Sequence, residues 1–439
     1  MTGLALGIDL GTSGVRSAVL DGADRVVAMA RASYGPGDGD RRDPARWRAA
    51  VGACLDAQMA ALRRAGADPA AIAGIAVDGT SGSLVLADGA CVPVTRALMY
   101  DDAGFTAEAA RIAVAAPAAH VARGPGSALA RALHLVAEDP AGRARHLMHQ
   151  ADVIAAWLMG RGGLTDVNNA LKTGVDPATG QWPDWVAGLL PDPDLLPHAH
   201  LPGAPLAPVA PGIAARFGLS AATMVHAGTT DSIAAFLAAA GPVPGAAVTS
   251  LGTTLAVKLW SDVRIDAPSL GLYAHRLGQG WLVGGASNTG GGVLRSLFAD
   301  DALATLSARI DPAVESPCDF YPLLRPGERF PVNDPALVPR LSPRPDDDVA
   351  FLHGLLESIA RIERDAYTIM AQLGAPRPTR IVTAGGGAAN PAWTAIRARV
   401  LGVPVTAAAT PEAAVGAARL ARMRPGRGAG QGADPWTTP

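Results

Sequence analysis

The stretch LALGIDLGTSGVRSAVL, residues 4–20, decides how the rest of this chain is interpreted. An apolar run reaches a single carboxylate at Asp9, is interrupted by GTSG at residues 11–14, and continues as a second apolar run from Val15. This pattern predicts a β-hairpin with an acid and two hydroxyls at its turn. Glycine N–H groups beside Thr and Ser hydroxyls can bind phosphate, and Asp9 can recruit the divalent cation that accompanies ATP. An ordinary hairpin with a polar turn is the alternative at this point.

A second stretch, AAVTSLGTTLAVKLW at residues 246–260, repeats this layout. An apolar strand is followed by Gly252, Thr253 and Thr254, and then by another apolar strand. Because the two copies lie far apart in the sequence, they predict two related lobes that face one nucleotide rather than a short-period solenoid.

Composition restricts the classes of partner. The chain has 439 residues, 49% of them hydrophobic, which is enough for two or three domains at roughly 150 residues each. Its net charge of −2 provides no basic surface for nucleic acid or for a membrane. Lys172 and Lys258 are the only lysines, and neither follows glycine, so a P-loop with its phosphate-binding lysine is excluded. Phosphate must be held by backbone, hydroxyls, a metal ion or arginine.

The cysteines and the apolar runs indicate a cytoplasmic protein. Cys54, Cys91 and Cys318 are scattered without the spacing of a disulfide framework or a zinc site. No apolar run approaches about 18 residues, and the N-terminus enters a strand at once, so neither secretion nor membrane spanning is expected.

Polar residues follow two further predicted elements in the first half. A short buried strand at 74–77 leads to Asp78 and Ser81, and polar residues at strand ends of an α/β sheet lie where ligands bind. Asp102 follows an aromatic residue and another acid, and capping of a helix that begins near Phe105 is the alternative to a ligand role. Residues 106–160 are expected to be helical, as is the apolar stripe from Trp47 to Leu62.

Two later segments carry chemistry. Asp231 directly precedes IAAFLAAA, so it is expected at the start of a helix, where the helix dipole keeps a carboxylate ionised; a simple capping role is the alternative. A strand at 380–384 leads to three glycines at 385–387, which let a flat ligand approach the backbone, and Asn390 opens the next helix. The tail at 424–439 is expected to be disordered.

Together these motifs resemble the FGGY carbohydrate kinases, within the superfamily of actin, hexokinase and the heat-shock chaperone ATPases. The motifs occur in the family's order: first phosphate motif at 7–14, catalytic aspartate motif at 228–232, second phosphate motif at 250–254, and adenosine motif at 384–393 with 412–418. The resemblance implies an α/β fold of two actin-like, ribonuclease H-like lobes with a nucleotide and sugar cleft between them. Residues 1–240 would form the sugar-binding lobe and 241–410 the nucleotide lobe, with a helix at 411–423 packing back on the first lobe.

The resemblance also implies an activity: transfer of the γ-phosphate of ATP, with Mg²⁺, to a primary hydroxyl of a small ketose. The segments 77–89, 97–103 and 168–185 are most similar to the short D-ribulokinases, some of which were first labelled xylulokinase-like. D-ribulose, giving D-ribulose 5-phosphate, is therefore the expected substrate. D-xylulose or another polyol is the alternative, and a non-kinase ATPase or sugar-sensing protein is a third possibility. The expected partner is one small sugar, with no nucleic acid or membrane, for a monomer or homodimer.

The resemblance assigns roles to individual residues. Asp231 is expected to be the catalytic base, and Asp9 with Asp231 to hold the metal ion. The expected ATP-binding residues are Gly11, Thr12, Ser13, Gly252, Thr253, Thr254, Gly386, Gly387, Asn390 and Trp393, and the expected sugar-binding residues are Asp78, Ser81, Asp102, Asp231 and Ser232. One departure from the family pattern is visible, because Gly104 stands where many members carry a sugar-binding arginine.

Overall fold

The computed structural model describes residues 3–35, 41–410 and 412–423, and these divide into two compact units. Within the described residues, the first unit comprises 3–238, 275–279 and 412–423, and the second comprises 239–274 and 280–410. The tail at 424–439, for which we predict disorder, lies outside the described residues.

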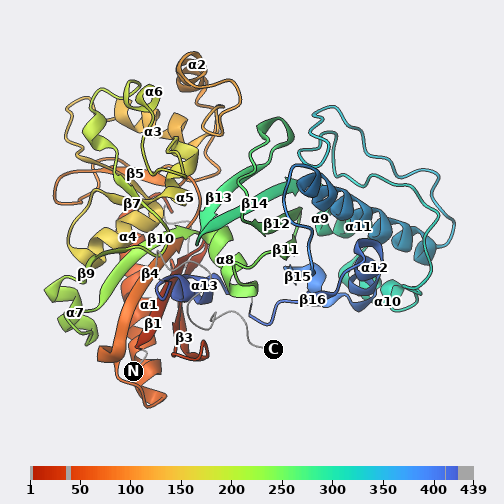
Figure 1. Cartoon of the computed structure of the whole chain (residues 1–439), viewed down its shortest axis with the longest axis horizontal. Helices are drawn as coiled ribbons and strands as arrows, with labels where there is room; N and C mark the ends of the chain where they lie inside the picture. Colours follow the sequence, from red (N-terminus) through yellow and green to blue (C-terminus); the bar gives the residue numbers. More distant parts are fainter. Residues whose placement is uncertain (1–2, 36–40, 411, 424–439) are drawn as a thin grey trace. The chain divides into compact units, whose positions relative to one another are not determined.

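The first unit is built on a six-stranded sheet. Its strands are β1 (Leu4–Leu10), β2 (Gly14–Leu20), β3 (Val26–Ser33), β4 (Ile72–Gly79), β9 (Pro205–Pro208) and β10 (Met224–Thr230). Their order across the sheet is β3-β2-β1-β4-β10-β9. Figure 1 labels β1, β3, β4, β9 and β10 of this sheet. The first three strands are antiparallel, whereas β4 and β10 run parallel to β1. The hairpin predicted for residues 4–20 is confirmed, with Leu10 opposite Val15 beside its turn.

Helices cover both faces of this sheet. On one face lie α1 (Pro44–Arg64), α4 (Gln150–Met159) and α7 (Pro211–Phe217), whose apolar side chains share a core with Val15 and Val19 of β2. Successive side chains of a strand point to opposite faces. Accordingly, Ala18 and Leu20 of β2 pack instead against α13 (Ala413–Leu420) and the end of α8 (Asp231–Ala239).

Smaller elements complete the first unit. They are β5 (Leu84–Ala87) paired with β6 (His146–His149), β7 (Leu164–Asp166) paired with β8 (His198–His200), and the helices α2 (Thr106–Ala115), α3 (Ala128–Ala137), α5 (Val167–Ala170) and α6 (Asp184–Ala187), with 3₁₀ turns at 69–71, 171–173 and 193–195. The expectation that 106–160 is helical throughout is wrong, because 146–149 pairs with β5 as a strand. A short apolar run does not by itself distinguish a strand from a buried helical segment.

The second unit has its own six-stranded sheet. Its strands are β11 (Ala246–Leu251), β12 (Leu255–Ser261), β13 (Tyr273–Leu277), β14 (Gly280–Ser287), β15 (Arg380–Ala384) and β16 (Val405–Ala407), in the order β13-β14-β12-β11-β15-β16. Residues 275–277 of β13 belong to this sheet although they group with the first unit. Here too, three consecutive strands (β14, β12 and β11) are antiparallel, and two further strands follow in parallel. The second predicted hairpin, β11 with β12, is therefore confirmed, and both units repeat one strand arrangement. The expected α/β fold class, with two sheet-containing units, is also confirmed.

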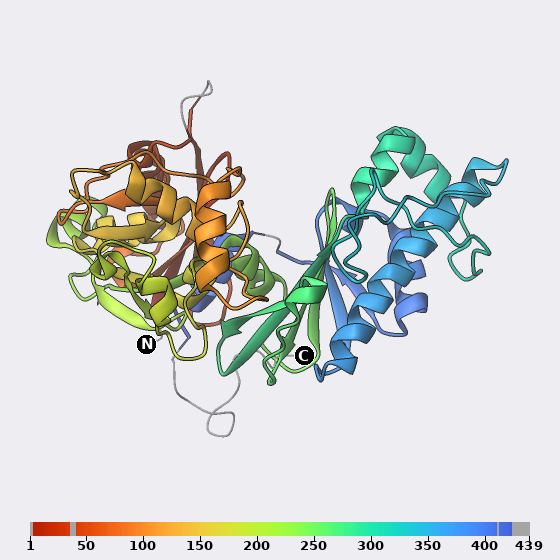
Figure 2. The same ribbon diagram turned by 90° about the horizontal axis from the view of Figure 1, so that it is seen from above.

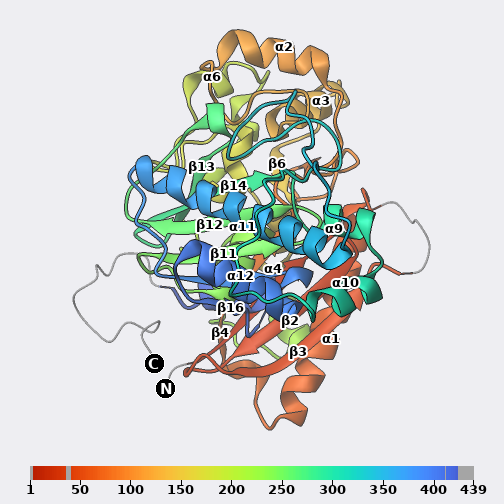
Figure 3. The same cartoon turned by 90° about the vertical axis from the view of Figure 1, so that its right-hand side faces the viewer.

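The helices of the second unit are α9 (Gly291–Leu297), α10 (Asp300–Ser307), α11 (Asp348–Gln372) and α12 (Pro391–Leu401), with 3₁₀ turns at 268–270 and 386–389. The long helix α11 runs beside the sheet (Figure 2) and lies in front of β11 and β12 together with α12 (Figure 3). Its residues Leu352, Leu356 and Ile359 are buried in the core of this unit, as their helical spacing predicts. Among the described residues, no helix is long and apolar enough to cross a membrane.

Glycine permits α13 to approach its neighbours at backbone distance. A Cβ atom added to Gly416 would lie 1.8 Å from the carbonyl oxygen of Ala234 in α8, and one added to Gly7 would lie 1.9 Å from the carbonyl oxygen of Ala414. The neighbouring atoms are backbone, so they cannot rotate away. Helix α13 is therefore in direct contact with both β1 and α8, the two elements that carry Asp9 and Asp231.

We expect Gly416→Ala to lower the free energy of unfolding by about 1–3 kcal/mol, the usual cost of overpacking. The matched control is Gly212→Ala in α7, where an added Cβ meets nothing within 4 Å. Alanine forms helix better than glycine, so the control should be as stable as the wild type or more stable. Urea unfolding of the three proteins compares these free energies. Equal stability of the two variants would show that the close contact of α13 does not matter.

Candidate active site

Three aspartates gather at one edge of the first sheet. Asp9 on β1 lies opposite Asp78 on β4, and Asp78 lies opposite Thr229 on β10. Because these strands are parallel, their carboxyl ends meet at the same edge, which is where ligands bind in sheets of this type. Asp231 begins α8 directly after β10, as expected, and the positive end of the helix dipole favours its ionised form.

Asp78 is the most deeply buried of the three. Its side chain is fully buried, and neither carboxylate oxygen has a hydrogen-bond partner among the described residues. Burial raises the pKa of Asp78 well above its usual value, and the charges of Asp9 and Asp231 raise it further. Asp78 therefore favours the neutral carboxyl. Both of its oxygens are buried, and its expected role as a sugar ligand stays a prediction.

Asp9 is accompanied by an arginine that sequence reasoning missed. The Arg16 guanidinium lies 3.3 Å from Asp9 Oδ2 and 3.3 Å from Glu412 Oε2. Among the described residues, no group of three or more acidic, histidine or cysteine side chains could hold a metal ion alone. This fits Mg²⁺, which commonly uses one or two carboxylates and completes its shell with water and substrate phosphates. Asp9 and Asp231, the two carboxylates predicted to hold the ion, would supply such donors.

The first phosphate turn is built as the sequence predicts. The Gly11 N–H donates to the Gly14 carbonyl at 3.0 Å, and the Tyr34 hydroxyl donates to the Gly11 carbonyl at 3.0 Å. Thr12 and Ser13 are exposed at the tip. Hydrogen bonds to the backbone of Gly11 and Gly14 thus stabilise the turn, while its two hydroxyl residues face solvent.

Two asparagines fix the strand that leads to Asp231. Asn168 Nδ2 donates to Thr229 Oγ1 at 3.0 Å, and Asn169 Nδ2 donates to the Thr229 carbonyl at 3.0 Å. Thr229 lies two residues before Asp231, so these bonds fix the position of the backbone that leads to the Asp231 carboxylate. The sequence shows both asparagines, but only the fold shows that they face β10.

The remaining sugar candidates differ in placement. Ser232 is exposed on the first turn of α8, and its N–H donates to Asp231 Oδ1 at 2.6 Å. Ser81 Oγ is buried and has no hydrogen-bond partner among the described residues, and its sugar-binding role stays a prediction. Ser232 and Asp231 are the candidates that the structure leaves accessible.

Asp102 forms hydrogen bonds within the protein. Both of its oxygens bind the Arg42 guanidinium, and Oδ2 accepts the Met99 N–H at 2.8 Å. Burial opposes ionisation of Asp102, but the hydrogen bonds from Arg42 and Met99 outweigh it and lower the pKa. The capping alternative is wrong, because the N-cap of α2 is Phe105. Asp102 is engaged by Arg42 in this structure, and its sugar-binding role stays a prediction.

The departure at Gly104 has a backbone cause. Gly104 has φ = +97°, a conformation that strains residues other than glycine, so an arginine there would be disfavoured. A buried arginine from α3 organises this segment instead. Arg131 donates to the carbonyl oxygens of Asp102 (2.9 Å), Tyr100 (2.5 Å) and Gly82 (3.0 Å). It shapes the segment through backbone contacts.

A cavity of about 760 Å³ lies in the second unit. Its volume is within the range of small-ligand sites, and part of its wall is apolar, with Leu294, Leu303 and Ile310. Four residues predicted to bind adenosine line it: Gly386, Gly387, Asn390 and Trp393. The structure therefore brings these four together around one space.

The individual roles of these residues differ. Asn390 caps α12, since its Oδ1 accepts the Trp393 N–H at 3.0 Å while its Nδ2 donates to Ser307 Oγ at 2.8 Å. Trp393 is only 2% exposed, so it forms the wall more than it offers a stacking face. A Cβ added to Gly387 would lie 2.6 Å from Leu251 Cβ, which explains the need for glycine there.

The second phosphate turn adjoins this cavity. A Cβ on Gly385, whose φ is +84°, would lie 3.2 Å from the Gly252 nitrogen, so the adenosine and second phosphate motifs are neighbours. The Gly291 and Gly292 N–H groups donate to the carbonyls of Gly252 and Thr253 at 3.0 and 2.9 Å. Arg295 lines the cavity and approaches Thr253 Oγ1 at 3.4 Å. This arginine is a phosphate candidate that sequence reasoning missed.

A carboxylate that can take up a hydroxyl proton and a nucleotide-sized cavity beside a phosphate turn are what an ATP-dependent sugar kinase needs. Comparison with protein families agrees. Residues 4–238 match the N-terminal domain, and residues 247–424 the C-terminal domain, of the FGGY family of carbohydrate kinases. The chain belongs to this family, and it is an ATP-dependent sugar kinase, as the sequence predicts.

Relatives match nearly the whole chain. A xylulose kinase of Streptomyces coelicolor is 29% identical over 462 residues, covering 99% of this chain and 91% of the relative. The structure of a xylulose kinase from Rhodospirillum rubrum matches with a TM-score of 0.82 and 24% identity, over 95% of this chain and 89% of that one. Glycerol kinase of Plasmodium falciparum, solved with ADP, matches with a TM-score of 0.80 at 14% identity, over 95% and 89%. The two structures show the shared fold.

The buried Asp166 predicts that stability depends on pH. It lies beside the two asparagines that contact β10. Asp166 accepts the N–H groups of Asn168 and Asn169, both at 2.9 Å. Burial raises its pKa to about 6, and the charge of Asp152 contributes, while hydrogen bonds from Asn169 partly offset the rise. The folded state thus binds the proton more tightly than the unfolded chain, so stability is lost as the pH rises from about 4 to about 6.

We expect the free energy of unfolding of the wild type, relative to Asp166→Asn, to fall by on the order of 3 kcal/mol between pH 4 and 7. Any hydrogen bond lost in the variant adds a constant offset, which does not depend on pH. Urea unfolding at several pH values measures the difference, with Asp194→Asn, which removes an exposed carboxyl, as the control. A difference that does not change with pH would contradict the raised pKa.

Proposed function

We propose that this protein transfers the γ-phosphate of ATP to a primary hydroxyl of a ketopentose, with D-xylulose as the favoured acceptor. The observation that carries the proposal is the position of Asp231, which begins α8 at the same edge of the sheet as Asp9. A general base must be ionised and accessible to the hydroxyl that it deprotonates. The helix start supplies the first condition, and the partial exposure of Asp231 supplies the second.

In the proposed reaction, Asp231 accepts the proton of the sugar hydroxyl as its oxygen attacks the γ-phosphorus. The new O–P bond forms as the bond to the ADP oxygen breaks, and ADP leaves with its negative charge. Asp231 then releases the proton to water. The exposed hydroxyls of Thr12 and Ser13 and the turn at 252–254 are assigned to the phosphates, and Arg295 is added to them.

Asp9 and Asp231 would hold Mg²⁺, which when bound neutralises charge on the phosphate oxygens. Adenosine is assigned to the cavity lined by Gly386, Gly387 and Trp393. Ser232 remains a sugar ligand in this proposal. Asp78 stays a predicted sugar ligand whose buried carboxyl lies beside Asp9.

The acceptor is proposed from the relatives. The Streptomyces relatives that align with 99% of this chain are named xylulose kinases, which supports D-xylulose over the D-ribulose expected from sequence motifs. D-ribulose remains the second candidate because of the segments at 77–89 and 97–103. The two sugars differ in the configuration of one hydroxyl, so the choice depends on few contacts.

We expect Asp231→Asn to lower kcat by at least about 10²-fold, since general-base catalysis typically contributes 10²–10⁴-fold. Asparagine has nearly the same shape but cannot accept the proton. Coupled ADP-release assays measure kcat, and calorimetric titration with ADP in the absence of Mg²⁺ is the control, which should give nearly the wild-type Kd. Turnover near the wild-type rate would show that Asp231 is not the base.

We expect kcat/KM to be higher for D-xylulose than for D-ribulose at equal ATP. An epimer that leaves a buried polar group unpaired can be rejected by on the order of 10⁴-fold. With no arginine at Gly104, we expect a smaller ratio here. A preference for D-ribulose would reverse the acceptor assignment and leave the kinase assignment intact. Nucleotide binding without phosphorylation of any ketose or polyol would favour a sugar-sensing protein.

A further inference from the structure

A buried ion pair lies within the second unit. Arg397 of α12 and Glu363 of α11 are both fully buried, and they form two hydrogen bonds, from Arg397 Nε to Glu363 Oε2 (2.6 Å) and from Nη2 to Oε1 (2.8 Å). Such a pair is costly to bury unless its remaining hydrogen-bonding positions are satisfied. The neighbouring hydroxyls satisfy them.

Three hydroxyls complete this cluster, which we name the Glu363–Arg397 network. Thr249 Oγ1 donates to Glu363 Oε1 at 2.5 Å and lies 2.9 Å from the Tyr367 hydroxyl. Arg397 Nη1 donates to Thr383 Oγ1 at 2.6 Å. All five side chains are at most 4% exposed. The network therefore joins two helices to two strands through hydrogen bonds that water does not reach.

The two threonines lie directly behind the proposed nucleotide loops. Thr249 on β11 and Thr383 on β15 are register partners in the parallel pair. β11 leads from Thr249 into Gly252, and β15 leads from Thr383 into Gly385 and Gly386. The network thus binds both strands near their carboxyl ends, directly before the turns assigned to phosphate and adenosine.

The helix α12 extends the same connection to the cavity wall. Arg397 lies about one helical turn after Trp393, which lines the cavity. Asn390 caps the start of the same helix. Three parts of the proposed nucleotide site, namely the second phosphate turn, the glycine turn and the start of α12, are therefore attached to one buried charge pair.

We propose that the Glu363–Arg397 network positions the nucleotide-binding loops, so that its five members are positioning residues for ATP. The inference rests on the proposed placement of the nucleotide in the second unit. A parallel strand pair alone leaves the turns beyond it free to shift. A desolvated, fully paired network has one favourable geometry, because displacing any member leaves a buried charge or hydroxyl unpaired.

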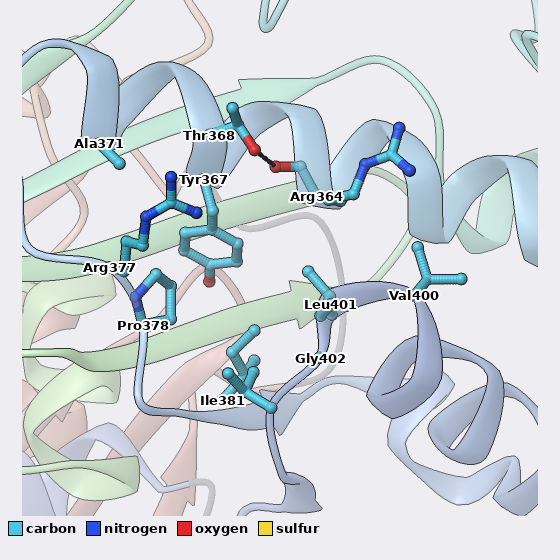
Figure 4. Close-up of a pocket in the computed structure, with 11 residues that line it drawn as sticks. Arg364, Tyr367, Thr368, Ala371, Arg377, Pro378, Ile381, Val400, Leu401 and Gly402 are labelled. Carbon is cyan, nitrogen blue, oxygen red and sulfur yellow. Dashed lines mark hydrogen bonds between the residues drawn. The ribbon is translucent and has the colours of Figure 1, made fainter.

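Tyr367 allows the network to be tested with little disturbance. Its ring borders a second cavity, of about 360 Å³, which is also lined by Arg364 and Arg377 (Figure 4). The ring therefore has free space on one side, while its hydroxyl points away from Arg364 and bonds Thr249. Tyr367→Phe removes one hydroxyl from the network and keeps the ring. Arg364→Ala, on the rim of the same cavity, is a matched control because Arg364 pairs with Asp365 outside the network.

The experiment measures the Kd for ADP by calorimetry, with no sugar present, for the wild type, Tyr367→Phe, Thr249→Val, the double variant and Arg364→Ala. We expect each network variant to weaken ADP binding about 3- to 10-fold, the size of one hydrogen bond expressed as affinity. Because the two side chains share one bond, the double variant should weaken binding by less than the product of the single effects. The control should bind ADP as the wild type does.

A KM comparison distinguishes positioning from a general structural role. In the kinase assay the network variants should show a higher KM for ATP and a sugar KM within about twofold of the wild type. Lower thermal stability with an unchanged Kd for ADP would overturn the inference, as would equal increases in both KM values. Failure of the wild type to bind ADP would overturn the proposed nucleotide site, and the inference with it.

Discussion

The parallel pairing of β1 with β4 and of β4 with β10 is the constraint on which the first unit depends. Backbone hydrogen bonding in this register brings Asp9, Asp78 and Asp231 to one edge, although they are distant in the sequence. Three carboxylates in one place repel each other, and the structure relieves this in three ways. Burial favours the neutral form of Asp78, Arg16 lies beside Asp9, and Asp231 lies at the positive end of a helix.

The second unit uses the same strand arrangement for different chemistry. Carboxylates gather at the edge of the first sheet, whereas glycines follow β11 and β15, and two of them, Gly386 and Gly387, line a cavity. Its charges lie behind the turns, buried and paired between Glu363 and Arg397. An acidic edge suits proton transfer and a metal ion, whereas a wall of glycine and apolar side chains suits a flat, largely neutral base.

Asp102 and Gly104 show how the same local pattern can serve the protein instead of a ligand. A polar pair after an aromatic residue is similar to a sugar-binding motif, yet Asp102 is held by Arg42, and the backbone at Gly104 suits glycine. Arg131, from a helix further along the chain, shapes this segment through its carbonyl groups. The conformation of this segment is therefore fixed by hydrogen bonds from Arg131 to backbone carbonyl oxygens.

The sequence by itself determined the two hairpins, the helix start at Asp231, the order of the motifs and the family. These features are local, because strand alternation, glycine turns and helix starts depend on neighbouring residues. Only the tertiary structure decided which polar residues are available. Asp78 and Ser81 are shielded from solvent, Asn168 and Asn169 face β10, and Glu363 meets Arg397 from another helix. The physical reason is that exposure and pairing depend on side chains brought together from distant parts of the chain, and local periodicity carries no information about that distance.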